Sequence, residues 1–253
     1  MLKYISMHIK SQLEYKSSFI FLVIAQLIAF FVYCVVFYSL FDKFGIVKSF
    51  NIYQVILCFS VVQFGENFAE GLLRGFDKFS EIIKHGHLDQ LLVRPQNIYL
   101  QVIGYKVELS KFVKCIISLI LLVYAYIKLK ISVVHIPIII LMLLGSSIVF
   151  GSVLIMGAAL CFVTIEGLEV VNIFIYGTRD FAQYPIGIYN KAVRIFFTYL
   201  VPIGLTSYFP MLYITGASNN LWYIFLPLLS ILTLIPACLI FNAGMKKYKS
   251  TGS

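Results

Sequence analysis

Five polar side chains share one face of a predicted helix within an apolar stretch of the chain. Their positions follow the 3.6-residue period of a helix: Gln63, Glu66, Asn67, Glu70 and Arg74. Carboxylates in an apolar environment are costly unless they pair with cations or face a wet cavity. Glu70 and Arg74 are four residues apart and could pair. The two acids repel each other unless they are paired, with Lys106, Lys111 and Lys114 as candidate cations.

Two interpretations of this polar face remain open. The side chains could line the cytoplasmic part of a transport pathway, or they could form ion pairs that only fix helix packing. A second acidic face has the same ambiguity. Glu166, Glu169 and Asn172 are three residues apart and could contact a partner or form a polar gate, or they could be the wet side of an interfacial helix.

No catalytic or cofactor motif accompanies these residues. The sequence lacks G-x-x-x-x-G-K-[ST], the loop that cradles ATP phosphates, and it has no Ser-His-Asp grouping. His85 and His87 have no third ligand nearby, and the five cysteines lie in apolar runs without a C-x-x-C pair. We therefore expect no metal, no cofactor and no enzymatic activity in this chain.

The composition defines the environment of these residues. The chain is 60% hydrophobic and 12% charged, whereas soluble domains are about 25% charged. An all-α membrane protein is expected, because the apolar runs are continuous rather than alternating as in a barrel strand. The first run is longer than a signal-peptide core and should stay in the membrane. Six membrane helices are predicted at about residues 19–41, 52–73, 106–127, 136–163, 193–213 and 222–243.

The distribution of basic residues predicts the orientation. With a cytoplasmic N-terminus, only four of the 20 lysines and arginines fall in outside loops: Lys43, Lys48, Lys128 and Lys130. This bias follows the positive-inside rule and places both termini in the cytoplasm. It also explains the net charge of +9, so a nucleic-acid partner is not expected.

The rest of the chain forms one membrane domain. Residues 1–18 have apolar positions at helical spacing between lysines, which favours a helix on the inner membrane surface over a plain charged flank. Residues 164–192 are too polar and glycine-rich for a confident span and are assigned to a cytoplasmic or interfacial loop. The late prolines, including Pro202 and Pro210, can kink the fifth span.

A charged segment separates the second and third spans. Residues 76–97 predict one or two short amphipathic helices under the membrane, interrupted at Gly86 and stopped before Pro95. Such a segment could dock a cytoplasmic machine or simply cap the helix bundle. The predicted docking residues are Lys84, His87, Leu88, Asp89, Leu91, Leu92, Arg94 and Pro95.

Several stretches carry a family resemblance. "GHLDQLLVRPQN" (86–97) resembles the G-x-L-D-x-L-L-x-R-P signature of ABC-2 type permeases, the membrane subunits of ATP-binding cassette exporters. "TIEGLEVVNIFIYG" (164–177), the block from 184 to 216, "LEYKSSFIF" (13–21) and "YKSTGS" (248–253) are similar to corresponding family segments. His87 departs from the pattern, because members often carry an acid there.

The resemblance implies a division of labour. Two such six-span permeases, identical or related, would form the pathway on two cytoplasmic ATPase subunits. Those ATPases would bind ATP and Mg²⁺, and residues 76–97 would act as the coupling helix. A bacterial cytoplasmic membrane is the expected location. An ATPase-independent secondary transporter or channel, with Glu66 and Glu70 carrying protons or ions, is the alternative.

Overall fold

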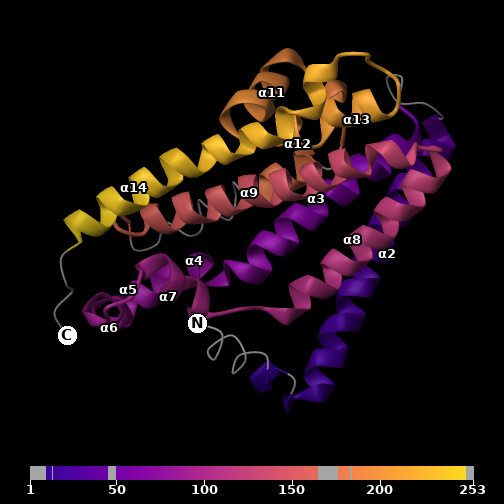
Figure 1. Cartoon of the computed structure of the whole chain (residues 1–253). Helices are drawn as coiled ribbons and strands as arrows, with labels where there is room; N and C mark the ends of the chain where they lie inside the picture. The colour runs from indigo at the N-terminus through magenta and orange to yellow at the C-terminus, as the bar shows by residue number, and fades with distance from the viewer. Residues whose placement is uncertain (1–9, 13, 45–49, 165–175, 183, 249–253) are drawn as a thin grey trace.

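The computed structural model describes residues 10–12, 14–44, 50–164, 176–182 and 184–248 (Figure 1). Within these ranges the chain forms helices and no β-sheet. Five helices are long and apolar enough to cross a membrane, and a bent helix pair would make a sixth. The predicted all-α membrane fold is thus confirmed, while the orientation of the termini stays a prediction. Most of the predicted interfacial segment 1–18 lies outside the described residues, although residues 10–12 are helical.

The long helices match the predicted spans with shifts at their ends. Their bounds are α2 (Lys16–Phe44), α3 (Ile52–Leu72), α8 (Leu109–Lys128), α9 (Ile136–Leu160) and α14 (Leu234–Lys247). The start of α3 is fixed by a capping box, in which Asn51 and Gln54 exchange side-chain and backbone hydrogen bonds. Pro137 lies in the first turn of α9, where its missing N–H costs nothing.

Helices α3 and α9 form the centre of the bundle. In the most apolar stretch of α3, 78% of the residues are buried, whereas in the corresponding stretch of α2 only 6% are buried. Helix α2 contacts α3 and α8, and its remaining surface is apolar. A helix that is apolar on its exposed sides is suited to lipid or to another membrane subunit.

A glycine allows the two central helices to approach closely. A Cβ atom added at Gly65 of α3 would collide with the Ser146 side chain of α9 and lie 2.7 Å from the Ser146 carbonyl carbon. Small residues at helix crossings let membrane helices pack by van der Waals contact. Gly65 therefore sets the distance between α3 and α9.

Four short helices follow α3: α4 (Arg74–Asp77), α5 (Phe79–Lys84), α6 (His87–Val93) and α7 (Ile98–Tyr105). The predicted interruption is present at Gly86, whose φ of 65° separates α5 from α6. This left-handed conformation is unfavourable for residues with a Cβ atom. Helix α6 ends at Val93, and the next residue, Arg94, is extended ahead of Pro95.

The third span begins later than predicted. The sequence places its start near Lys106, but α7 ends at Tyr105 and α8 starts at Leu109. Between them the chain is extended, and residues from other segments form hydrogen bonds with its backbone groups. The Gln12 side chain donates to the Val107 carbonyl (2.6 Å) and accepts from the Leu109 N–H (2.9 Å). The Glu108 N–H donates to the Gly71 carbonyl (3.1 Å).

The fifth predicted span is not a straight helix. The segment Lys191–Leu200 meets Ile203–Ile214 at an angle of 78°. It comprises α11 (Lys191–Ile195), a π-helical turn η3 (Phe196–Leu200), α12 (Ile203–Thr206) and α13 (Tyr208–Ile214). The bend lies at Pro202, which has no N–H to continue the helix.

The sixth predicted span is irregular in its first half. The 3-10 helix η5 (Leu226–Thr233) precedes α14. The Ser230 hydroxyl donates to the Pro227 carbonyl (2.7 Å), and the Thr233 hydroxyl donates to the Ser230 carbonyl (2.6 Å). Thr233 also contacts Ser152 of α9 at 2.7 Å. Each of these hydrogen bonds gives a hydroxyl group a partner inside the bundle.

The close crossing of α3 and α9 gives the first prediction. Gly65→Ala should lower the free energy of unfolding by about 1–3 kcal/mol, because the added methyl group overpacks the contact with Ser146. The measurement is the thermal unfolding midpoint of the purified protein in detergent. Gly177→Ala is the matched control, since nothing lies within 4 Å of its added Cβ. Equal midpoints for the two variants would contradict the role of Gly65.

Candidate functional site

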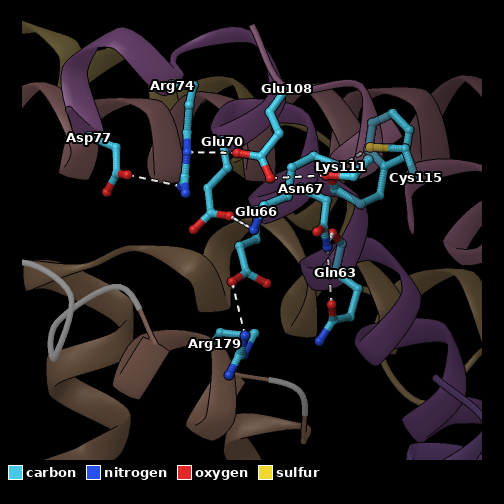
Figure 2. A network of polar contacts seen from close by, with 12 residues as sticks. Gln63, Glu66, Asn67, Glu70, Arg74, Asp77, Glu108, Lys111, Cys115 and Arg179 are labelled. Carbon is cyan, nitrogen blue, oxygen red and sulfur yellow. Dashed lines mark hydrogen bonds and ion pairs between the residues drawn. The ribbon is translucent and has the colours of Figure 1, made fainter. Parts of the chain in front are cut away.

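The acidic side chains on α3 pair with cations from two other segments (Figure 2). Glu70 forms an ion pair with Lys111 of α8. Glu66 pairs with Arg179 at 3.3 Å, and Arg179 belongs to the helical residues 176–182. The sequence-based expectation that span three supplies a cation is confirmed for Lys111. The pairs connect α3 to segments that are 41 and 113 residues away in the chain.

Arg74 has partners other than the predicted one. It contacts Asp77 at 2.9 Å and Glu108 at 2.8 Å, so the predicted Glu70–Arg74 pair is wrong for this structure. The reason is competition: Lys111 occupies the Glu70 carboxylate, and the break before α8 brings Glu108 to Arg74. Burial raises the pKa of Asp77, and the Arg74 charge opposes that shift.

The two amides on the polar face bind each other. The Asn67 side chain donates to the Gln63 carbonyl at 2.7 Å and to the Gln63 side-chain oxygen at 3.2 Å. Both residues are buried within α3. The Asn67 side-chain nitrogen is thereby satisfied within α3, without a partner from another helix.

The polar face lies inside the protein in this conformation. Glu66 and Glu70 are each 2% exposed. This geometry favours the interpretation that ion pairs hold the helices together. One Glu66 oxygen, Oε2, has no hydrogen-bond partner among the described residues. The role of these side chains in a pathway stays a prediction.

The second predicted acidic face cannot be placed. Glu166, Glu169 and Asn172 lie outside the described residues. Their proposed contact with a partner, or their role as a gate, stays a prediction. The neighbouring residues 176–182 supply Arg179, whose pairing with α3 sequence reasoning missed. Its only sequence signal is that it is a basic residue in a loop that could face buried acids.

The predicted docking residues divide into exposed and buried groups. Lys84, Leu92, Arg94 and Pro95 are exposed. Leu88 and Leu91 are buried, so these two leucines hold α6 in place and do not form its outer surface. His87 and Asp89 are partly buried, and the His87 ring contacts the Tyr105 hydroxyl at 3.0 Å.

Val93 is an exposed apolar residue that was not among the predicted docking residues. Val93 is 85% exposed at the end of α6, next to Leu92 at 48%. We call Leu92, Val93, Arg94 and Pro95 the α6 tip. Arginine is enriched at protein interfaces, and the buried core of an interface is more apolar than the rest of a protein surface. The helical period could have identified Val93, because it falls on the face of α6 opposite the buried Leu88 and Leu91.

The short helices are attached to α14 by aromatic rings. Phe241 of α14 is fully buried and packs against Phe76, Phe79 and Tyr99 with ring centroids 5.5, 5.2 and 5.2 Å away. Phe162, just after α9, is 5.6 Å from the same ring. We call these five residues the aromatic cluster. Each such pair contributes about 0.5–1.5 kcal/mol beyond burial.

A polar contact strengthens this attachment. The Tyr99 hydroxyl of α7 donates to the side-chain oxygen of Asn242 on α14 at 2.9 Å. The short helices and the end of α14 therefore lie at the same end of the bundle, as Figure 1 also shows.

A second ion pair lies at the start of α5. The Lys78 side chain donates to the Glu81 carboxylate at 2.6 Å, and this hydrogen bond lowers the pKa of Glu81.

The buried pair between α3 and α8 gives the second prediction. Lys111→Met should destabilise the protein by about 3 kcal/mol, because it leaves the Glu70 charge buried without a partner. Adding Glu70→Gln should restore much of the loss. The measurement is the unfolding midpoint of the single and double variants. Lys78→Gln is the control, since its pair with Glu81 is largely exposed and such pairs contribute about 0–1 kcal/mol. If Lys111→Met behaves like Lys78→Gln, the buried pair does not hold α3 to α8.

Comparison with known proteins places this arrangement in a family. A family model described as ABC-2 family transporter protein matches residues 17–252. No curated protein and no solved structure matches the chain. The matched range includes the ion pairs of α3, the short helices and the bent pair. The chain belongs to the ABC-2 transporter family and is a multi-pass membrane permease.

Proposed function

We propose that this permease is the membrane subunit of an ABC exporter and that residues 76–97 couple it to a separate ATPase. The α6 tip is the observation that carries the proposal. It combines two exposed apolar side chains with Arg94 at the end of a short helix, while Leu88 and Leu91 anchor the same helix inside the protein. The tip is thus available to a partner, and its base is fixed.

A coupling element must move together with the membrane helices. The aromatic cluster supports this requirement, because it packs α4, α5 and α7 against Phe241 of α14. Protein interiors packed in this way transmit displacement rather than absorb it. A push on the α6 tip would therefore reach the end of α14.

The ion pairs offer a second route from the short helices to the bundle. Arg74 of α4 contacts Glu108 at the start of α8. Glu66 of α3 contacts Arg179, close to the bent segment that begins at Lys191. A displacement of α4 would thus bias α8 directly and the bent segment through α3.

The partners follow from what the chain contains. With no P-loop sequence, ATP and Mg²⁺ belong to the ATPase subunits, and two of them would bind a pair of permeases. The second permease, identical or related, would complete the pathway wall. The exposed apolar sides of α2 are suited to that contact or to lipid.

A secondary transporter that works without an ATPase is less well supported. Proton or ion carriers need carboxylates that change their charge or exchange partners. Here Glu70 is paired with Lys111 and Glu66 with Arg179. These contacts support a structural role for the two acids and leave the energy source to a partner.

The α6 tip gives the third prediction. Val93→Asp should weaken association with the ATPase roughly tenfold, because a buried carboxylate at an interface costs more than 1 kcal/mol. The permease is isolated from its native membrane in mild detergent, and the amount of co-purified nucleotide-binding subunit and its ATP hydrolysis are measured. Arg94→Glu should have a similar effect.

Val134→Asp is the matched control. Val134 is 80% exposed and lies beyond the other end of α8, in a predicted outside loop. It should leave the ATPase bound at the level of the unchanged protein. Full ATPase association in both Val93→Asp and Arg94→Glu would contradict the docking role of the α6 tip. If no nucleotide-binding subunit co-purifies with the unchanged protein, the exporter proposal itself fails.

A further inference from the structure

A pocket of about 690 Å³ lies at the end of the bundle that carries the short helices. Its walls come from the segment before α2, the first two turns of α2, α4 with the residue after it, and the break between α7 and α8 with the start of α8. Gln12 fixes one wall by its two hydrogen bonds to Val107 and Leu109. The volume is within the range of small-molecule sites in proteins.

The lining of the pocket is divided by chemistry. Lys78, Lys106 and Arg74 contribute cations, and Glu108 contributes one acid. Three serine hydroxyls belong to the polar part of the wall: Ser11, Ser18 and Ser110. The apolar part comes from the start of α2 and the residue before it: Tyr15, Phe19 and Leu22. A ligand that fits must have an anionic, hydrogen-bonding end and an apolar end.

The cations differ in how firmly they are held. Arg74 is fixed between Asp77 and Glu108. Among the ion pairs of the described residues, none includes Lys106. Lys78 pairs with Glu81, but that carboxylate is 49% exposed, and an exposed ion pair adds little stability. Lys78 can therefore exchange Glu81 for a phosphate at small cost, and Lys106 is available for the same phosphate.

The apolar part of the pocket continues onto a membrane helix. Phe19 and Leu22 lie in the first two turns of α2, and the apolar residues that follow Leu22 at helical spacing, Ala25, Ala29 and Val36, are exposed. A chain that leaves the pocket along α2 would thus stay in the hydrocarbon layer. A free phosphate would use the cations but none of this surface.

We propose that this pocket binds an anionic phospholipid, with its phosphate between Lys78 and Lys106 and its acyl chains along α2. The Ser11 and Ser18 hydroxyls line the pocket and would contact the headgroup, whereas the Ser110 hydroxyl donates to Glu108 (2.9 Å). Lipid bound here would join the segment before α2 to the short helices. The inference concerns lipid binding alone and does not depend on the proposed ATPase.

Native mass spectrometry of the purified permease tests the proposal. Phosphatidylglycerol and phosphatidylcholine with identical acyl chains are titrated in separate experiments. Lys78→Gln with Lys106→Gln should lower the affinity for phosphatidylglycerol roughly thirtyfold, which corresponds to about 1 kcal/mol for each lysine near a membrane surface. The affinity for phosphatidylcholine should stay low and unchanged.

The control keeps the same loss of charge at the same end of the bundle. Lys246 and Lys247 are exposed at the end of α14, outside the pocket, and their change to Gln should leave phosphatidylglycerol binding intact. An unfolding midpoint for each variant shows that it is folded. Equal losses in the two double variants would overturn the proposal, as would equal binding of both lipids.

Competition with inorganic phosphate tests whether the pocket recognises a free phosphate or the phosphate of a lipid headgroup. If millimolar phosphate displaces phosphatidylglycerol completely, the pocket is a phosphate site, and the lipid assignment is wrong. Retention of the lipid under these conditions supports it, because the acyl chains then contribute to binding. This readout needs no ATPase and no transport, so its failure would leave the proposed function untouched.

Discussion

The structure depends on how two carboxylates are kept inside an apolar helix bundle. Glu66 and Glu70 are 2% exposed, and a buried charge without a partner costs several kcal/mol. The chain meets this constraint by bringing Lys111 from α8 and Arg179 from a distant segment to the same helix. Breaking one partner is expensive, whereas the pair itself adds little net stability. The pairs therefore specify which segments touch α3 more than they stabilise the fold.

A second constraint acts at the end of α3, where the chain leaves the bundle and returns. Four short helices fill this stretch, and their inner sides carry the aromatic cluster around Phe241. Arg74 connects the first of them to Glu108 at the start of α8. Aromatic packing on one side and ion pairs on the other hold the short helices as one body. The α6 tip projects two adjacent apolar side chains outward beside an arginine, which is why we propose the docking role for it.

The sequence predicted the fold class, most of the spans and the break at Gly86, because these depend on local composition and on backbone rules for glycine and proline. It also named Lys111, with Lys106 and Lys114, among the candidate partners of the α3 acids, and the structure selects Lys111. It missed Arg179, because a contact across 113 residues leaves no local signal. The late start of α8 was missed for the same reason, whereas the prolines of the fifth span indicated a kink there, without its size of 78°. Gln12 satisfies the backbone at the first of these breaks, and hydropathy alone cannot reveal such a partner. Leu88 and Leu91 were placed on the docking face, although their burial makes them anchors.

The proposed coupling requires the short helices and α14 to move as one body when the ATPase binds ATP. Spin labels at Gln90 of α6 and Lys246 of α14, both exposed, measure this by pulsed electron resonance, on a background without the five native cysteines. We expect the distance between these labels to be the same with and without ATP in the assembled transporter. The distance from Gln90 to a label at Lys191 of α11 should change. A nucleotide-dependent change between Gln90 and Lys246, with Gln90 to Lys191 constant, would contradict it.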